Sequence, residues 1–284
     1  MSQAPKEQEV TRRAVARTNA GRVRSQNQDA FKLDDAAGLW IVADGMGGNR
    51  GGEVASRLAC DRIHEEVAKG EGLDAAIRAT HDELLHYSQE HPDVQGLGTT
   101  LVVVQELPRK QSYRLYWVGD SRIYLWRDNR LTQLSEDHGV VQRLVKAGKI
   151  TEAQARVHPQ RHVITSCLGG DLPTELEVGA RLETWRRGDR LLLCSDGLTD
   201  ELEDAKLNAI LCQHSDDAAC ADALMKAALD AGGRDNVSVV LISAPENAKP
   251  PAGRVRNVLN LVGFGFVGAG VALGLILLAK YLKP

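Results

Sequence analysis

Several protein classes are excluded by what this 284-residue chain lacks. A formal net charge of −3 leaves no global basic footprint for nucleic acid. None of the five cysteines belongs to a CxxC pair, and Cys167 and Cys194 lie in apolar runs, so free thiols in a reducing compartment are favoured over disulfides or a zinc site. Residues 1–10 contain no apolar stretch of the signal-peptide kind, and we therefore expect the folded part to stay in the cytoplasm.

What the chain does contain is an apolar run that ends in a carboxylate. The run from Leu39 to Ala43 is typical of a buried strand, and Asp44 follows it directly, ahead of a glycine-rich loop. A dinucleotide-binding loop is excluded because the third glycine of that pattern falls on Arg50, and a P-loop is excluded because the loop has no lysine. A strand that ends in aspartate fits a metal site, although Asp-Gly alone is also compatible with a plain turn.

The same arrangement recurs three times further along the chain. Asp120 lies between two predicted strands, Asp196 follows the apolar run from Arg190 to Ser195, and Asp235 precedes the predicted strand Val237 to Ile242. Four aspartates brought together would repel one another unless cations lay between them. Oxygen ligands suit Mg²⁺ or Mn²⁺, and two such ions can activate a water molecule and hold a phosphate.

The pattern of predicted elements also indicates the fold class. The strands are short and often joined by hairpins, and the regular strand–helix alternation of a parallel sheet is absent. Antiparallel sheets with helices on their outer faces are therefore favoured. Helices are predicted over 53–68, 73–88, 204–213 and 217–231.

Six short motifs then occur in a characteristic order. They are Arg24-Ser25-Gln26-Asn27-Gln28-Asp29, Val42-Ala43-Asp44-Gly45-Met46-Gly47-Gly48, Gly98-Thr99-Thr100, Val118-Gly119-Asp120-Ser121-Arg122, Ser195-Asp196-Gly197 and Gly233-Arg234-Asp235-Asn236. Together they resemble the metal-dependent serine/threonine protein phosphatases of the PPM (PP2C-like) family, in its bacterial form. The resemblance covers about Val10 to Ser243, and the tail lies outside it.

This resemblance implies an α+β fold, a four-layer α-β-β-α sandwich of two antiparallel sheets with the metals in a cleft at one edge. It implies hydrolysis of phosphoserine and phosphothreonine on proteins by direct attack of a metal-bound hydroxide, with two Mn²⁺ or Mg²⁺ ions and a third, weaker metal. A eukaryotic-type bacterial Ser/Thr kinase is the expected opposing enzyme. Two alternatives stay open: a phosphatase of a partner-switching pathway, and a catalytically inactive phosphoprotein-binding module.

The resemblance also assigns roles to the carboxylates. Asp44 corresponds to the catalytic carboxylate that bridges both metals, and Gly45 to the backbone carbonyl ligand of the first metal. Asp196 and Asp235 correspond to ligands of the second metal. Asp29 corresponds to an outer ligand that acts through water. Loss of Asp44, Asp196 or Asp235 would mark an inactive module, and all three are present.

Further positions concern the substrate and the third metal. Asp120 corresponds to the ligand of the weaker third metal, with help from Asp196. Arg24 corresponds to the catalytic arginine that grips the substrate phosphate, since a guanidinium fork matches phosphate oxygens. Met46 stands where eukaryotic members have a histidine proposed as the general acid, and it has no proton to donate. Gln28 stands where many members have glutamate.

The segment 131–182, the flap, is predicted to be an excursion outside the main sheets that borders the substrate groove. It contains two short predicted helices, at 140–147 and 151–155. His158 and His162 lie four residues apart, but Pro159 between them argues against a helical metal-binding pair. Both histidines are interpreted as surface or structural residues.

The two ends of the chain are expected to differ from the phosphatase domain at 10–243. Residues 1–9 are predicted to be a disordered tail, and 244–257 a proline-containing linker. The apolar and glycine run from Leu261 to Ala279 would span roughly 28 Å as a helix, close to the thickness of a bilayer core. A transmembrane helix at 258–280, with the catalytic domain on the cytoplasmic side, is favoured over a buried core helix.

Overall fold

The computed structural model describes residues 13–107, 111–170, 172 and 175–250. Contacts between Cα atoms group the chain into one unit, Met1–Pro251, and a second, Ala252–Pro284. The predicted tail at 1–9 and the predicted membrane helix at 258–280 lie outside the described residues. Among the residues that are described, no helix combines the length and apolar character needed to cross a membrane.

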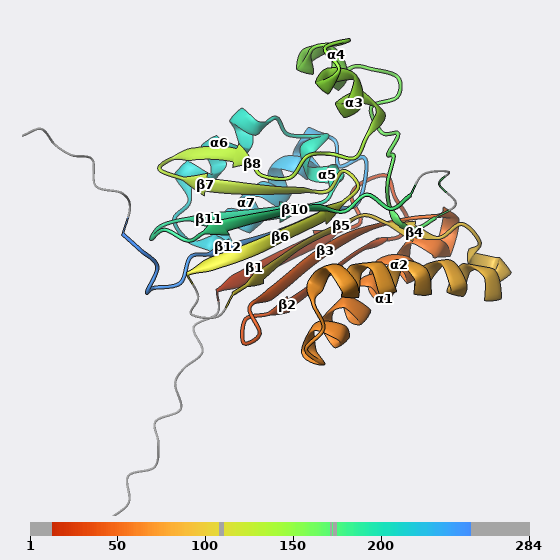
Figure 1. Cartoon of the computed structure of the whole chain (residues 1–284). Coiled ribbons are helices and arrows are strands. Elements are labelled where there is room, and N and C mark those ends of the chain that lie inside the picture. The colour runs from red at the N-terminus through yellow and green to blue at the C-terminus, as the bar shows by residue number, and fades with distance from the viewer. Residues whose placement is uncertain (1–12, 108–110, 171, 173–174, 251–284) are drawn as a thin grey trace, which may run out of the picture. The chain divides into compact units, whose positions relative to one another are not determined.

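Two antiparallel sheets form the centre of the described unit (Figure 1). The first has the order β1 (Ala14–Asn19), β12 (Val237–Ser243), β11 (Arg190–Cys194), β7 (Arg122–Arg127) and β8 (Arg130–Gln133). The second has the order β10 (Gly179–Thr184), β6 (Ser112–Val118), β5 (Leu101–Glu106), β3 (Leu39–Met46), β4 (Gly98–Thr99) and β9 (Leu168–Gly169), and β2 (Asp29–Asp34) also pairs with β3. All of these pairings are antiparallel, as the sequence predicted.

Helices cover the outer face of each sheet. The second sheet is covered by α1 (Gly48–Ala68) and α2 (Leu73–Glu90), joined to β4 through the 3₁₀ helix η1 (Pro92–Val94). The first sheet is covered by α5 (Asp196–Thr199), α6 (Asp204–Gln213) and α7 (Asp217–Ala231). Figure 1 shows the two helical layers on opposite sides of the paired sheets. The predicted sandwich of helices, two sheets and helices is therefore present.

The central strand β3 explains why its sequence is a continuous apolar run. Trp40 and Val42 pack in the core between the two sheets. Leu39, Ile41 and Ala43 pack on the other side, in the core beneath α1 and α2. Because side chains alternate between the two faces of a strand, a strand that is buried on both faces needs an apolar residue at every position.

The flap carries α3 (Val140–Lys146) and α4 (Glu152–Arg156), which project beyond the sheets in Figure 1. Its predicted limits at 131 and 182 are too wide, because β8 and β10 belong to the two sheets. A two-residue hairpin at Asp128 and Asn129, with φ of 53° and 63°, returns the chain into β8. Asp and Asn tolerate the positive φ angles that this turn requires. The turn brings β8, whose apolar content is low, into the sheet beside β7.

The linker predicted from residue 244 begins too early. Ala248 is 3% exposed and packs in the core between the sheets. A turn closed by a hydrogen bond from the Ala248 amide to the Pro245 carbonyl (2.9 Å) folds this segment back onto the domain. The low apolar content of the segment concealed this contact, because a single alanine is enough to fill the site.

Candidate metal centre

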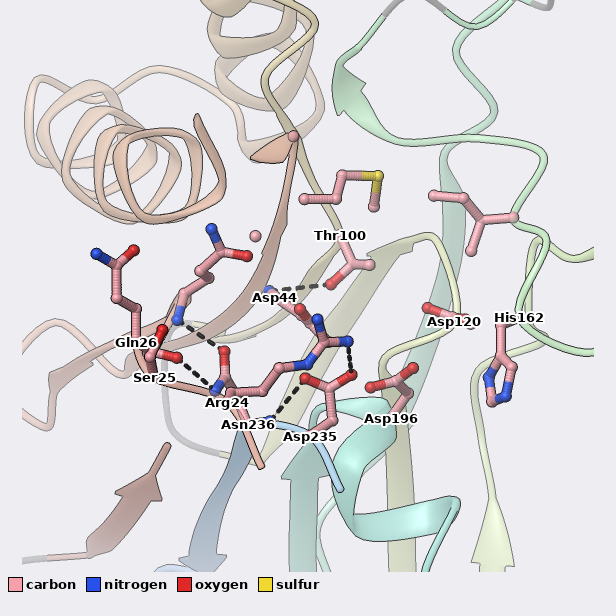
Figure 2. A pocket seen from close by; sticks show the side chains of 15 residues that line it. Arg24, Ser25, Gln26, Asp44, Thr100, Asp120, His162, Asp196, Asp235 and Asn236 are labelled. Carbon is pink, nitrogen blue, oxygen red and sulfur yellow. Dashed lines mark hydrogen bonds and ion pairs between the residues drawn. The ribbon is translucent and has the colours of Figure 1, made fainter. Parts of the chain in front are cut away.

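Four aspartates from the ends of strands in both sheets line one cleft of about 460 Å³. Asp44 lies near the end of β3, Asp120 in the turn between β6 and β7, Asp196 at the start of α5, and Asp235 just before β12. Figure 2 shows these side chains around a common space. The structure thus brings together the four carboxylates that the sequence predicted to converge.

Asp29 lies beside this group without lining the cleft. It is paired with Asp44 across the β2–β3 ladder, and its Oδ2 atom accepts a hydrogen bond from the Ser195 hydroxyl (2.8 Å). Its Oδ1 atom is buried and has no hydrogen-bond partner among the described residues. Burial raises the pKa of Asp29 to about 6, because the ionised form is poorly solvated there.

The cleft carboxylates are electrostatically unfavourable as a set. Burial raises the pKa of Asp44 well above its usual value, and the neighbouring charges of Asp29, Asp196 and Asp120 raise it further. The pKa of Asp196 is raised by burial and then by Asp120, and burial raises the pKa of Asp120 to about 7. Protonation or bound cations would relieve this repulsion.

Backbone contacts of unusual closeness hold the end of β3 in place. A Cβ atom on Gly45 would lie 2.0 Å from the carbonyl oxygen of Gly52, so only glycine permits α1 to approach the strand here. The Asp44 amide donates to Thr100 Oγ1 (3.1 Å), and the Asp44 carbonyl accepts from the Thr100 amide (2.8 Å). Thr100 therefore positions Asp44 through hydrogen bonds.

Arg24 lies at the same cleft, where its Nη2 atom donates to Asp235 Oδ2 (2.7 Å) and its side chain is 57% exposed. The side chain of Asn236 holds the segment that carries Arg24 in place through hydrogen bonds. The Asn236 side chain accepts from the Gln28 amide (2.8 Å) and donates to the carbonyls of Ala20 (3.0 Å) and Gln26 (2.8 Å). Asn236 is therefore a structural residue of the site.

His162, in the cleft, and Asp200, beside it, are residues of the site that sequence reasoning missed. His162 lines the cleft, and its Nδ1 atom lies 3.2 Å from Asp200 Oδ2. One ligand atom from each of His162, Asp196 and Asp200 lies within 4.8 Å of the others. His162 was interpreted as a surface or structural residue, and it is exposed as well as part of the cleft. The local sequence does not indicate which flap residue faces the strand ends.

The residues fit a pair of hard divalent cations. The strand-end donors are carboxylate oxygens, which suit Mg²⁺ or Mn²⁺ better than softer metals. Burial and neighbouring carboxylates raise the pKa values of Asp44 and Asp196, which is the sign of negative charges that lack counter-charge. The Oδ1 atom of Asp29 has no hydrogen-bond partner among the described residues and can accept one. The exposed guanidinium of Arg24 adds a donor that can reach an anion in the same cleft.

Comparison with known proteins decides the family. The model of the family described as protein phosphatase 2C matches residues 18–231. The chain belongs to the protein phosphatase 2C family. It is 40% identical over 235 residues to the serine/threonine protein phosphatase PstP of Mycobacterium tuberculosis, covering 81% of this chain and 44% of the relative, so it spans less than half of that protein's length.

One further relative, and a solved structure of the PstP catalytic domain, match over nearly their full length. The serine/threonine phosphatase stp of Listeria monocytogenes is 35% identical over 242 residues, which cover 81% of this chain and 94% of the relative. A solved structure of the catalytic domain of PstP in complex with two manganese ions is 38% identical with a TM-score of 0.72, covering 81% of this chain and 97% of that structure. The predicted PP2C-like fold of two antiparallel sheets is thereby confirmed.

Proposed function

We propose that this chain is a metal-dependent phosphatase that hydrolyses phosphoserine and phosphothreonine on proteins. The observation that carries the proposal is the convergence of four carboxylates, three of them half-buried with raised pKa values, in one cleft beside an arginine. The relatives named above, which are called serine/threonine phosphatases, support the proposal. The manganese ions of the PstP catalytic domain support the choice of metal.

The position of each residue in the cleft suggests which metal it would contact. Asp44 would contact both metals, the carbonyl of Gly45 the first, and Asp196 and Asp235 the second, while Asp29 would orient a water molecule. When bound, the metal pair would supply a nucleophile from water at neutral pH and neutralise the phosphate. Asp44 and Asp196 are already the two cleft carboxylates with the most strongly raised pKa values, which favours their placement nearest the cations.

Two residues of the cleft bear on the leaving group and on the third metal. Asp120 would bind the weaker third metal together with Asp196, since both line the same cleft and the charge of Asp120 raises the pKa of Asp196. Met46 lines the cleft as well, and its thioether has no proton to donate. The proton for the leaving oxygen must therefore come from another group.

The test of the activity is direct. Purified protein should release phosphate from phosphoserine and phosphothreonine peptides in the presence of Mn²⁺, and much more slowly from the matched phosphotyrosine peptide. A binding module without activity would retain the phosphopeptides unchanged, and that outcome would refute the proposal. The presence of Asp44, Asp196 and Asp235 in the cleft argues against such a module.

Arg24 is proposed to hold the substrate phosphate, exchanging its ion pair with Asp235 for the ligand. Arg24→Ala should raise KM for a phosphothreonine peptide about tenfold, with a smaller fall in kcat, because a bidentate charge-assisted contact to the substrate is lost. The matched control is Arg22→Ala, which removes an exposed arginine paired with Asp230 (3.4 Å) away from the cleft. Steady-state kinetics in Mn²⁺ should separate the two variants, and equal kcat/KM values would refute a contact between Arg24 and the substrate phosphate.

We further propose that the natural substrates are phosphoproteins and that a Ser/Thr kinase acts in opposition to this chain. We also propose that the tail tethers the catalytic domain to the cytoplasmic face of a membrane. The support is the apolar run from Leu261 to Ala279. Full-length protein should sediment with membranes, whereas a chain ended after Pro251 should be soluble and equally active on a peptide. The cut is placed there because Ala248 packs in the core. Full-length protein in the soluble fraction would contradict the tether.

A further inference from the structure

The buried histidine at the base of the flap contacts the turn that carries Asp120. His138 is 6% exposed. Its backbone amide donates to the Gly119 carbonyl (2.8 Å), and its Nδ1 atom accepts from the Gly119 amide (3.2 Å). The backbone amide and carbonyl of Gly119, the residue before Asp120, are therefore both hydrogen-bonded to His138.

The Thr100 side chain lies against the other side of the turn. Gly119 has a φ of +92°, and a Cβ atom on it would lie 2.8 Å from Thr100 Cγ2. Thr100 in turn contacts Ser121 through the two hydroxyls (2.7 Å) and holds the Asp44 amide. The turn is thus clamped between His138 and the threonine that positions Asp44.

The same histidine fastens both limbs of the flap. The Thr165 amide, on the returning limb, donates to the His138 carbonyl (2.7 Å). The His138 Nε2 atom lies 4.0 Å from Glu177 Oε1, and Glu177 also contacts Arg143 of α3 (3.2 Å). Next to it, both carboxylate oxygens of Asp137 accept from the guanidinium of Arg122 at the start of β7, with a shortest distance of 2.6 Å. Residues 137–138 therefore lie where the flap, β7 and the Asp120 turn meet.

We propose that His138 is a positioning residue that sets the place of the Asp120 carboxylate and couples it to the flap. This inference rests on the proposed function, in which Asp120 takes part in the chemistry of the cleft. Nδ1 must be unprotonated to accept from Gly119, so the ring proton is on Nε2, facing Glu177. A movement of the flap is then transmitted to the Asp120 turn through one rigid ring.

A pair of amide variants tests this role. The side-chain carbonyl oxygen that His138→Asn introduces takes approximately the place of Nδ1, whereas the longer side chain that His138→Gln introduces reaches toward the place of Nε2 and leaves the Gly119 amide without an acceptor. Hence H138Q should lower kcat on a phosphothreonine peptide about 10- to 100-fold with KM changed less than about twofold, and H138N should stay within about threefold of the wild type.

The chain offers a matched control for the loss of such a bond. The Nδ1 atom of His81 on α2 accepts from the amide of Gly169 (3.1 Å), which is the same kind of contact at another place. His81→Gln should lower the melting temperature without a comparable loss of kcat. Equal losses of kcat in H81Q and H138Q would mean that His138 only supports the fold, and the proposal would be wrong.

A double mutant and a spectroscopic readout complete the test. In an Asp120→Ala background, H138Q should cause little further loss of kcat, and multiplicative losses would overturn the coupling. If the wild-type protein hydrolysed no peptide, the proposed function would fail, but the carboxyl ¹³C resonance of Asp120 would still decide the positioning role. A shift in H138Q that is restored in H138N supports it, and an unchanged resonance in H138Q refutes it.

Discussion

Replacing Asp44 with asparagine is expected to lower kcat on phosphopeptides about 1000-fold or more. The side chain has nearly the same shape, but it loses the charge that would hold both metals and thereby the means to activate water at neutral pH. The control is Asp61→Asn, which makes the same chemical change at an exposed residue paired with Lys32 (2.8 Å). Initial rates at saturating peptide and Mn²⁺ compare the two variants with the wild type.

Stability measurements separate a metal effect from a folding effect in Asp44→Asn. The metal-free variant should melt no lower than the metal-free wild type, because the pKa of Asp44 is raised by burial and by neighbouring carboxylates, so its ionised form is unfavourable there. Added Mn²⁺ should then raise the melting temperature of the wild type far more than that of the variant. Retained activity, or an unchanged response to Mn²⁺, would contradict the bridging role.

Removal of divalent metal is expected to abolish hydrolysis and lower the melting temperature by about 5–10 °C relative to protein in saturating Mn²⁺. A ligand present at 100 times its dissociation constant stabilises the folded state by about 2.7 kcal/mol. For a domain of this size, about 1 kcal/mol corresponds to about 2–4 °C. Calorimetry and a phosphate-release assay before and after EDTA treatment measure both effects, and readdition of Mn²⁺ is the control. Full activity after exhaustive chelation would refute metal dependence.

The chelated protein should also respond to pH in a definite direction. The pKa values of Asp29 and Asp120 are raised to about 6 and about 7, so the folded state keeps protons that the unfolded chain releases near pH 4. Their contribution to stability is present at low pH and is lost as the pH rises through these folded values. The melting temperature should therefore fall between pH 5 and pH 8 without metal, and much less in Mn²⁺.

The flap is the part of this protein phosphatase 2C domain that contacts the cleft from outside the two sheets. The flap contributes His162 to the cleft and fastens to the Asp120 turn at His138. Because Arg24 is paired with Asp235 in this structure, a substrate phosphate held as we propose would have to compete with Asp235 for the guanidinium. Kinetics of flap and cleft variants on the same peptide would measure these contributions separately.

Local pattern alone predicted many elements closely. The predicted helices at 204–213 and 217–231 have the observed bounds of α6 and α7, and α7 begins at the predicted place because the Asp216 side chain caps it by accepting from the Ala219 amide (2.8 Å). The apolar runs that end at Asp44 and Asp196 became β3 and β11. These signals depend on residues close together in the chain, which is why the sequence reveals them.

Other features required contacts between distant residues. The first long helix was expected from Glu53, yet α1 begins at Gly48, because the close approach of Gly45 and Gly52 packs its first turn against β3. The register that pairs Asp29 with Asp44, the return of Ala248 to the core and the position of His162 in the cleft have no local signature.

The sequence by itself determined the strand-end carboxylates, the antiparallel class and, through the order of six motifs, the family. Only the tertiary structure decided how charges share the cleft, that Arg24 pairs with Asp235, and that His138 joins the flap to the Asp120 turn. The physical reason is that the burial and backbone geometry of each position determine its residue type and the local periodicity. A short stretch of sequence is enough to reveal both. Ion pairs and hydrogen bonds between segments far apart in the chain depend on how the two sheets and the flap come together.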